Sequence, residues 1–393
     1  MASVNASLPG NRLGRNELGA IFALNLVQGL PAYFFTVAMP ALLRDRGASL
    51  DLVGLTYVVW LPWALKWIWA PVFDARPLLR LSVLRAGPVA LALAFLSLLW
   101  SHPEHDVAPV LVTAALASTI GATLQIIVGA EVIHRTDSAA RAIANVLQVT
   151  GMTLGGVMGG AVLLGLSEHI GWTSSIAATA TMIVLAGLTA FQMRKGSIIP
   201  SRRPSIRDVV TNRRILVLPV LVGFGNVADG FLGAWLVDQG HGAVEVGRYL
   251  GLFAVLAMIP ASAVAGLLLR TMRLGRTLIL LFAVKGGLLA AMAFVPMQGI
   301  LAVAVAVTAF AMSAALMTAV WQSYMASVSE SASATGFAFL TSMEALVIML
   351  GGMAAGQAAL QWGYSPVFCI SVTAVCLAAL MTPIFSASRT GAP

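Results

Sequence analysis

Long apolar runs separated by short polar links form the main pattern of this chain. Twelve runs are long enough to cross the ~30 Å hydrocarbon layer of a bilayer as α-helices. They lie near residues 18–43, 50–73, 83–100, 108–133, 139–165, 171–193, 215–238, 246–269, 277–295, 299–326, 334–360 and 363–386. The pattern therefore predicts an all-α integral membrane protein with twelve transmembrane helices.

The composition supports this class and excludes a soluble protein. Hydrophobic residues make up 59% of the chain and charged residues only 10%, whereas soluble domains average about 25% charged residues. The net charge of +8 comes from residues scattered over short loops, which is not the pattern of a nucleic-acid surface. Cys369 and Cys376 lie seven residues apart in one apolar run, roughly 10 Å along a helix, too far to form a disulfide.

The distribution of arginine and lysine predicts the orientation of the chain. With a cytoplasmic N-terminus, 18 of the 23 basic residues fall in cytoplasmic segments. Only Arg44, Arg46 and Arg248 fall on the opposite side, and Lys66 and Lys285 lie inside apolar runs. This asymmetry follows the positive-inside rule, so both termini are expected to be cytoplasmic.

The chain has features of an internal duplication. The longest polar interruption, 194–214, divides the twelve runs into six and six. Asp45 and Gly47 recur as Asp238 and Gly240, at an offset of 193 residues. Several transporter folds consist of such repeats. We therefore expect a six-helix bundle over 1–193, a cytoplasmic loop over 194–214, a second bundle over 215–393, and together the major facilitator architecture.

Several motifs resemble one branch of that superfamily, the AmpG and RhtX/FptX transporters. They are Gly29-Leu30-Pro31, Asp45-x-Gly47, Leu61-Pro62-Trp63-x-Leu65-Lys66-x-x-Trp69-Ala70-Pro71-x-x-Asp74, Asp229-Gly230 and Leu236-x-Asp238-x-Gly240. The resemblance implies import of muropeptides or iron-siderophores across a bacterial inner membrane. One departure concerns the fourth helix, where the branch has a Gln-Asp-x-x-x-Asp segment. This chain keeps Gln125 but has Ile126 and Ala130 at the acidic positions, followed by Glu131.

Lys66 is the strongest candidate for a functional residue. It lies eight residues before Asp74, roughly 12 Å along a helix, within a tryptophan-rich run. An ammonium in lipid at that depth costs at least ~2.5–3.5 kcal/mol, so it is expected to face protein or water. Beside indole rings it could bind a carboxylate, catecholate or phenolate of a substrate. A structural pairing with a buried carboxylate, or snorkelling to the interface, is the alternative.

Three carboxylates are candidates for proton coupling: Asp229, Glu344 and Glu131. Asp229 falls near the middle of the seventh run, where an ionisable residue is a functional candidate by default. It could carry a proton, contact substrate, or form a salt bridge with Lys66 from the other half. Lys285, in the ninth run, is expected to snorkel to the interface.

Aromatic and amide side chains on the predicted pore-lining helices complete the substrate-binding candidates. The aromatic residues favour a bulky, partly aromatic substrate, although most membrane aromatics are core or interface anchors. The amides could equally form interhelical hydrogen bonds worth ~0.6 kcal/mol. Besides Lys66, the candidates are Tyr33, Trp60, Trp63, Gln125, Gln148, Trp235, Gln322 and Tyr324.

Asp74, Arg76 and Arg80 follow the second run and resemble a degenerate form of the superfamily's loop 2–3 motif. In that motif an aspartate near a helix N-terminus stabilises one conformation electrostatically. We therefore expect these residues to form a conformational latch.

The sequence contains no hydrolase, metalloprotease or nucleotide-binding motif. All five histidines fall in predicted loops, so neither a metal site nor a cofactor is expected. We predict a monomeric secondary transporter of the bacterial inner membrane that imports a siderophore or similar metallophore by proton symport. An exporter of drugs or metallophores and a muropeptide permease remain alternatives on the same fold. A membrane enzyme or sensor would need a catalytic set or an output domain.

Overall fold

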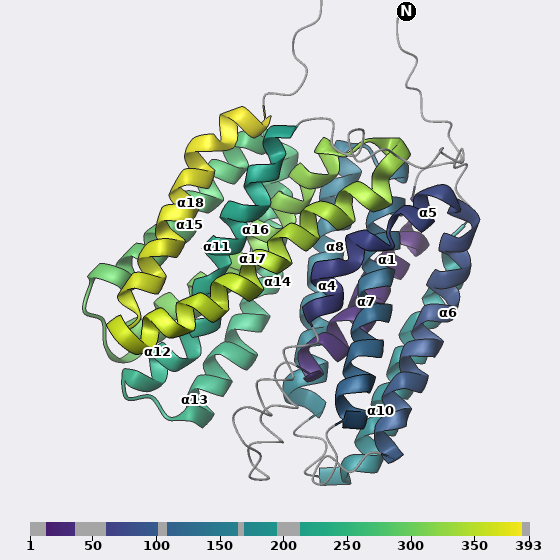
Figure 1. Cartoon of the computed structure of the whole chain (residues 1–393), viewed down its shortest axis with the longest axis horizontal. Helices are drawn as coiled ribbons and strands as arrows, with labels where there is room; N and C mark the ends of the chain where they lie inside the picture. The colour runs from purple at the N-terminus through teal and green to yellow at the C-terminus, as the bar shows by residue number, and fades with distance from the viewer. Residues whose placement is uncertain (1–12, 36–59, 101–107, 164–168, 195–212, 387–393) are drawn as a thin grey trace, which may run out of the picture.

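The computed structural model describes residues 13–35, 60–100, 108–163, 169–194 and 213–386, and the elements within these ranges are helices (Figure 1). The all-helical fold class is therefore confirmed. Most of the predicted central loop, the Asp45-x-Gly47 link and the outer parts of the first two predicted spans lie outside the described residues.

Helices before the central loop lie on one side of the molecule, coloured purple to blue in Figure 1, and we call them the N-half. Their bounds are α1 (Arg15–Tyr33), α4 (Trp60–Leu65), η3 (Lys66–Ile68), α5 (Pro71–Ala75), α6 (Pro77–Leu96), η4 (Ser97–Trp100), α7 (Ala108–Arg135), α8 (Ser138–Val157), η5 (Met158–Val162), α10 (Trp172–Gly187) and η6 (Leu188–Gln192).

Helices after the central loop lie on the other side, coloured teal to yellow, and we call them the C-half. Their bounds are η7 (Arg213–Leu216), α11 (Val217–Val227), η8 (Ala228–Phe231), α12 (Leu232–Asp238), α13 (Ala243–Arg248), η9 (Tyr249–Ala254), α14 (Val255–Thr271), α15 (Leu274–Phe294), α16 (Gly299–Ser327), η10 (Glu330–Ala332), α17 (Ser333–Trp362) and α18 (Ser365–Ser386).

Nine helices among the described residues are long and apolar enough to cross a membrane. They agree with nine predicted runs, except that the third span begins at Pro77 rather than near residue 83. The difference arises because Arg80 resembles a loop residue in sequence but is buried in the structure, with 2% of its surface exposed. The described parts of the other three predicted spans are α1, α4 to α5, and α8 with η5.

Two breaks within helices place charged residues inside the bundle. The second span leaves the α-helical conformation at η3, which begins at Lys66, and restarts at Pro71. Pro71 has no N–H to donate to a preceding turn, so a tighter turn before it is expected. The seventh span has a similar break, η8, which contains Asp229 and Gly230. Glycine lowers helix stability and suits such a break.

A glycine seam joins α1 to α8 within the N-half. At Gly151, Gly155 and Gly159 an added Cβ would collide with the backbone oxygens of Phe22, Leu26 and Leu30, respectively. The two backbones can approach this closely only because these positions lack side chains. The seam holds α1 firmly against α8, so the polar residues of α1 have a fixed position.

Candidate functional site

Two charged residues from opposite halves lie at the same depth in the bundle. The Asp74 carboxylate accepts hydrogen bonds from the backbone N–H groups of Ala334 and Thr335, at 2.9 and 2.8 Å. Lys66 precedes Asp74 by eight residues, and Glu344 follows Thr335 by nine. Because the N-half segment runs toward this contact and α17 runs away from it, both charged side chains lie on the same side of the contact, roughly 12–14 Å from it.

Lys66 is buried in the N-half, with 2% of its surface exposed. Its ammonium donates a hydrogen bond to Oε1 of Gln125 on α7 and lies 5.2 Å from the ring centroid of Trp63. This distance is within the range of a cation–π interaction. The Glu344 carboxylate is close enough to interact electrostatically with the ammonium.

Glu344 is held within the C-half by two hydrogen bonds. The Tyr324 hydroxyl donates to Oε2 at 3.0 Å, and Nδ2 of Asn226 approaches Oε1 at 3.5 Å. Nearby, the hydroxyl of Ser342 donates to the backbone oxygen of Trp63 at 3.2 Å, across the boundary between the halves. We call Lys66, Gln125, Asn226, Tyr324 and Glu344 the central cluster.

The central cluster can bind a ligand through charges of both signs. An anionic group could bind Lys66, and a cationic or hydroxyl group could bind Glu344. Each charge belongs to a different half, so a ligand that binds both would connect the halves. The cluster is therefore the best candidate for a substrate site in the described part of the chain.

The second buried lysine, Lys285 on α15, corrects two sequence-based expectations. It does not snorkel, because none of its surface is exposed. Its ammonium donates to Oδ1 of Asp229 at 2.5 Å and to the Ala309 backbone oxygen and Ser313 hydroxyl, each at 2.8 Å. Asp229 therefore pairs with Lys285 of its own half, not with Lys66. The reason is the packing of α15 against α16, which brings the lysine to the η8 break.

The hydroxyl of Ser313 closes this arrangement by donating to the other Asp229 oxygen at 2.5 Å. We call Asp229, Lys285 and Ser313 the charge triad. It connects the break in the seventh span to α15 and α16. The proton-coupling role of Asp229 stays a prediction.

Two predicted amides connect the halves instead of lining the central cluster. Gln148 donates to Asn145 at 3.0 Å, and Asn145 donates to Gln322 at 3.0 Å. The amide nitrogen of Gln322 in turn donates to the Ser138 backbone oxygen at 3.1 Å. This chain of hydrogen bonds joins α8 to α16, which fits the alternative role of interhelical bonding.

The predicted aromatic residues separate into different environments. Trp60 packs against Trp63 near Lys66, with ring centroids 6.3 Å apart. Trp235 instead meets Phe368 edge-to-face at 5.8 Å, inside the C-half. The side chain of Tyr33 lies outside the described residues. Of the aromatic candidates whose side chains are described, Trp60, Trp63 and Tyr324 belong to the surroundings of the central cluster, and Trp235 does not.

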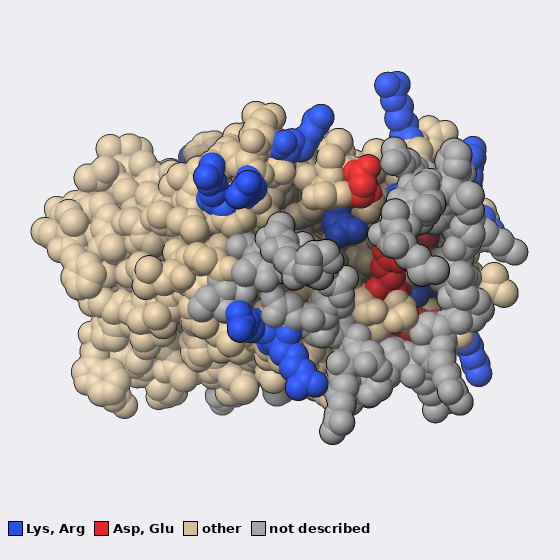
Figure 2. All heavy atoms as spheres, turned by 90° about the horizontal axis from the view of Figure 1, so that it is seen from above, with Lys and Arg blue, Asp and Glu red and all other residues tan. Residues whose placement is uncertain are grey.

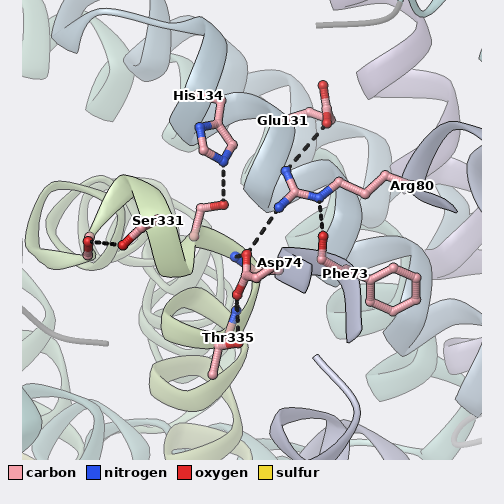
Figure 3. Close-up of polar contacts among 10 residues, drawn as sticks. Phe73, Asp74, Arg80, Glu131, His134, Ser331 and Thr335 are labelled. Atoms are coloured by element: carbon pink, nitrogen blue, oxygen red, sulfur yellow. Dashed lines mark hydrogen bonds and ion pairs between the residues drawn. The ribbon is translucent and has the colours of Figure 1, made fainter. Parts of the chain in front are cut away.

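The end of the bundle that carries α5 and the start of α17, at the top of Figure 1, holds a buried network that we call the clasp. Arg80 donates to Asp74 at 3.0 Å and to the Phe73 backbone oxygen at 2.8 Å (Figure 3). The Thr335 hydroxyl also donates to Asp74, at 2.6 Å. The predicted latch thus has a geometric basis in Asp74 and Arg80, whereas Arg76 is exposed.

Glu131, predicted as a coupling residue, lies in the clasp and not in the central cluster. Its carboxylate is 3.7 Å from Arg80 and 3.9 Å from Arg135, and Arg135 pairs with Glu17 at 2.6 Å. Figure 2 views this end of the molecule and shows basic side chains spread across it, with the visible acidic side chains gathered on the right. By its two distances, the Glu131 carboxylate connects Arg80 with Arg135 inside the N-half.

Sequence reasoning missed the site residues Asn226 and Ser313 and the pairing of Lys285. A serine or asparagine inside an apolar helix is common and carries no distinctive signal. Lys285 was recognisable as an intramembrane charge, but its partner depends on how α15 is rotated, which the apolar pattern does not specify.

Comparison with known proteins identifies the family. The sequence matches the Major Facilitator Superfamily over residues 21–352, so the chain belongs to that family. A relative assigned as transporter AmpG 4 in Rickettsia conorii is 22% identical over 279 residues, which cover 64% of this chain and 67% of the relative. Family and fold place the chain among multi-pass membrane transporters rather than enzymes.

Solved transporter structures share the fold. The human organic anion transporter MFSD10 aligns with a TM-score of 0.74 at 14% identity, covering 94% of this chain and all (100%) of that protein. A bacterial homologue of the iron transporter ferroportin, in an outward-facing state, aligns with a TM-score of 0.70 at 15% identity, covering 96% and 100%. At these identities the likeness concerns the fold alone.

Proposed function

We propose that this major facilitator is a secondary transporter that imports a siderophore or a similar organic metallophore by alternating access, with proton coupling. The proposal includes a monomer in a bacterial inner membrane, both termini in the cytoplasm, and six-helix bundles over 1–193 and 215–393. The observation that carries the proposal is the central cluster, which combines Lys66 and Glu344 from opposite halves at one depth.

Alternating access requires a site that both halves share, so that rocking the halves exposes the site to one side and then the other. The clasp closes the bundle at the end we assign to the cytoplasm, because Asp74 of the N-half holds Thr335 of the C-half. In this conformation substrate would reach the central cluster from the opposite side. An importer would take up its substrate in this conformation.

The chemistry of the cluster favours an anionic and partly aromatic substrate. The Lys66 ammonium beside the Trp63 ring can hold a carboxylate, phenolate or catecholate, the groups with which many siderophores bind iron. The names of two compared proteins, an organic anion transporter and a homologue of an iron transporter, agree with this chemistry.

Glu344 is the carboxylate that best fits proton coupling. Asp229 pairs with Lys285, and Glu131 lies in the clasp. Glu344 belongs to the central cluster, where we expect the substrate to bind. If Glu344 takes up a proton on one side of the membrane and releases it on the other, the flux of protons is linked to the flux of substrate. The missing carboxylates at Ile126 and Ala130 are then not required.

An uptake assay tests the proposal. Host cells that lack their own inner-membrane siderophore importers would express the wild-type chain and receive radioactive iron bound to a panel of siderophores. We expect accumulation of at least one complex, and a protonophore should abolish it. Accumulation should be lost with Lys66→Met and kept with Leu93→Ala, a control in which a side chain with 62% of its surface exposed is shortened.

Two results would contradict the proposal, one against import and one against proton coupling. If no complex accumulates and the expressing cells instead secrete metallophore or become resistant to drugs, the chain is an exporter. Accumulation that persists with the protonophore would mean that the chain is a facilitator without proton coupling.

A further inference from the structure

We propose that Gln28, Trp63 and Lys66 form an oxyanion subsite that binds a hydroxycarboxylate group, such as an ortho-hydroxybenzoate, of the transported molecule. The assignment rests on the proposed function only in treating this ligand as part of the substrate. Gln28 carries none of the roles predicted from the sequence. The structure assigns it through polar atoms that have no partner in the part of the chain that the structure describes.

Unpartnered buried polar atoms are the first observation. The indole nitrogen of Trp63 and both amide atoms of Gln28 are buried and have no hydrogen-bond partner among the described residues. Gln28 has 0% of its surface exposed and Trp63 has 3%. Folded proteins satisfy most such atoms, so exceptions of this kind often mark a place for a ligand.

The second observation is that Trp63 and the Gln28 backbone pack beside the same position of α7, Gly121. A Cβ on Gly121 would lie 3.4 Å from Cζ2 of Trp63 and 4.0 Å from the Gln28 backbone oxygen. Gln125, one turn further along α7, accepts the hydrogen bond from Lys66. The absence of a side chain at Gly121 lets Trp63 and the Gln28 backbone lie close to α7.

The set of donors determines the charge of the ligand. An ammonium has three N–H donors, and among the described residues Gln125 is the single hydrogen-bond acceptor of Lys66, so two remain for a ligand. The Trp63 indole adds one donor and the Gln28 amide adds two. Several donors with one positive charge match a carboxylate, whose oxygens only accept.

The free amide oxygen of Gln28 adds specificity. It cannot bond to a carboxylate, but it can accept a hydrogen bond from a hydroxyl group next to one. An ortho-hydroxycarboxylate has both groups on neighbouring atoms, and its ring can lie against the Trp63 indole. A plain carboxylate would leave the oxygen unpartnered and should bind more weakly.

Calorimetry on the purified full-length protein tests the subsite with salicylate, benzoate and benzamide as probes. We expect saturable salicylate binding with a Kd of about 1 mM, as suits a small fragment. Benzoate should bind about threefold to tenfold more weakly, and neutral benzamide should show no saturable binding, because each lacks a group that the subsite recognises.

Variants connect the binding to named atoms. Lys66→Met should weaken salicylate binding by about tenfold or more, and Trp63→Phe by about threefold to tenfold, because each removes donors. Gln28→Met should remove the preference for salicylate over benzoate. Trp172→Phe makes the same ring change at a tryptophan that packs against Phe34, outside the subsite, and should leave binding unchanged.

Thermal stability provides a readout that separates binding from structure. Gln28→Met replaces buried polar atoms that have no partner among the described residues with apolar atoms of similar volume, so the melting temperature should stay the same or rise while binding falls. A fall in melting temperature with unchanged binding would show that these groups support the fold through water, and would overturn the subsite.

Failure of the subsite can be distinguished from failure of the transport proposal. No salicylate binding by the wild type, or equal binding by wild type and Lys66→Met, overturns the subsite even if iron-siderophore uptake is intact. Salicylate binding that responds to the variants as stated supports the subsite even if no siderophore accumulates, in which case import of siderophores is the proposal that falls.

Discussion

The two buried lysines of this protein have different surroundings. Lys285 in the C-half uses all three N–H donors, on Asp229, the Ala309 backbone oxygen and Ser313. Lys66 in the N-half has a single hydrogen-bond acceptor among the described residues, Gln125, and lies against the Trp63 ring. Both are costly to place in a membrane. One is fully satisfied by the protein, and the other is not.

This difference separates a structural charge from a functional one. A fully coordinated ammonium holds its helices together, and its counter-charge cannot move without breaking the arrangement. An incompletely coordinated ammonium has capacity for a ligand. We therefore expect substrate to bind at the central cluster, to which both halves contribute residues, and not at the charge triad. Four predictions test this comparison.

The largest effect is expected from Lys285→Met. This substitution leaves the Asp229 carboxylate buried without its cation, and breaking such a pair costs ~3–5 kcal/mol. We expect loss of most folded protein, measured by fluorescence-detected size exclusion and thermal unfolding. The double variant Lys285→Met with Asp229→Leu should recover much of the stability, because no charge is then stranded. Wild-type stability of Lys285→Met would show that the charge triad does not hold the helices.

Lys66→Met should have the opposite profile. The substitution removes one hydrogen bond to Gln125 and relieves the cost of a partly coordinated cation, so we expect stability within ~1 kcal/mol of wild type. Substrate accumulation should nevertheless be lost. Thermal unfolding and uptake should be measured on the same preparation of Lys66→Met. If Lys66→Met is as unstable as Lys285→Met, Lys66 has a structural role as well.

The sequence was sufficient to predict the helices and the candidate charges. An apolar run of about 20 residues has few alternatives in a membrane, and a charge within it stands out. The predicted start of the third span, near residue 83, is too late, because Arg80 resembles a loop residue in sequence. Its buried partners Asp74 and Glu131 are evident only in the structure.

The pairings could not be predicted in the same way. The sequence analysis offers only Lys66 as a salt-bridge partner of Asp229 and expects Lys285 to snorkel, because helix rotation and packing, which decide the partner, are left open by the sequence pattern. Gln28 was overlooked because a glutamine in an apolar helix is usually satisfied by a neighbour. Only coordinates show that its amide has no partner among the described residues.

The clasp extends the comparison to charges that must separate during transport. Asp74→Asn removes the charge that pairs with Arg80 and accepts from the start of α17, so the closed clasp should lose ~1–3 kcal/mol relative to the open one. Labelling of a cysteine introduced at Ser333, with both native cysteines replaced, should become faster. Thr335→Val removes only a hydroxyl donor and should have a smaller effect. Unchanged labelling in Asp74→Asn would contradict the latch.

The smallest effect is expected at Trp235, the C-half tryptophan that the sequence analysis lists together with Trp63 among the candidate substrate contacts. Its ring meets Phe368 edge-to-face at 5.8 Å and 90°, and phenylalanine can keep an aromatic contact of this kind. Trp235→Phe should therefore lower the free energy of unfolding by ~1 kcal/mol, through lost volume, and leave uptake within about twofold of wild type. Trp63→Phe, the same exchange in the N-half, should cost a similar amount of stability through lost volume but reduce uptake more strongly, because its indole N–H has no partner in the described protein and is available to substrate. Equal loss of uptake in both variants would remove the distinction between packing and binding tryptophans.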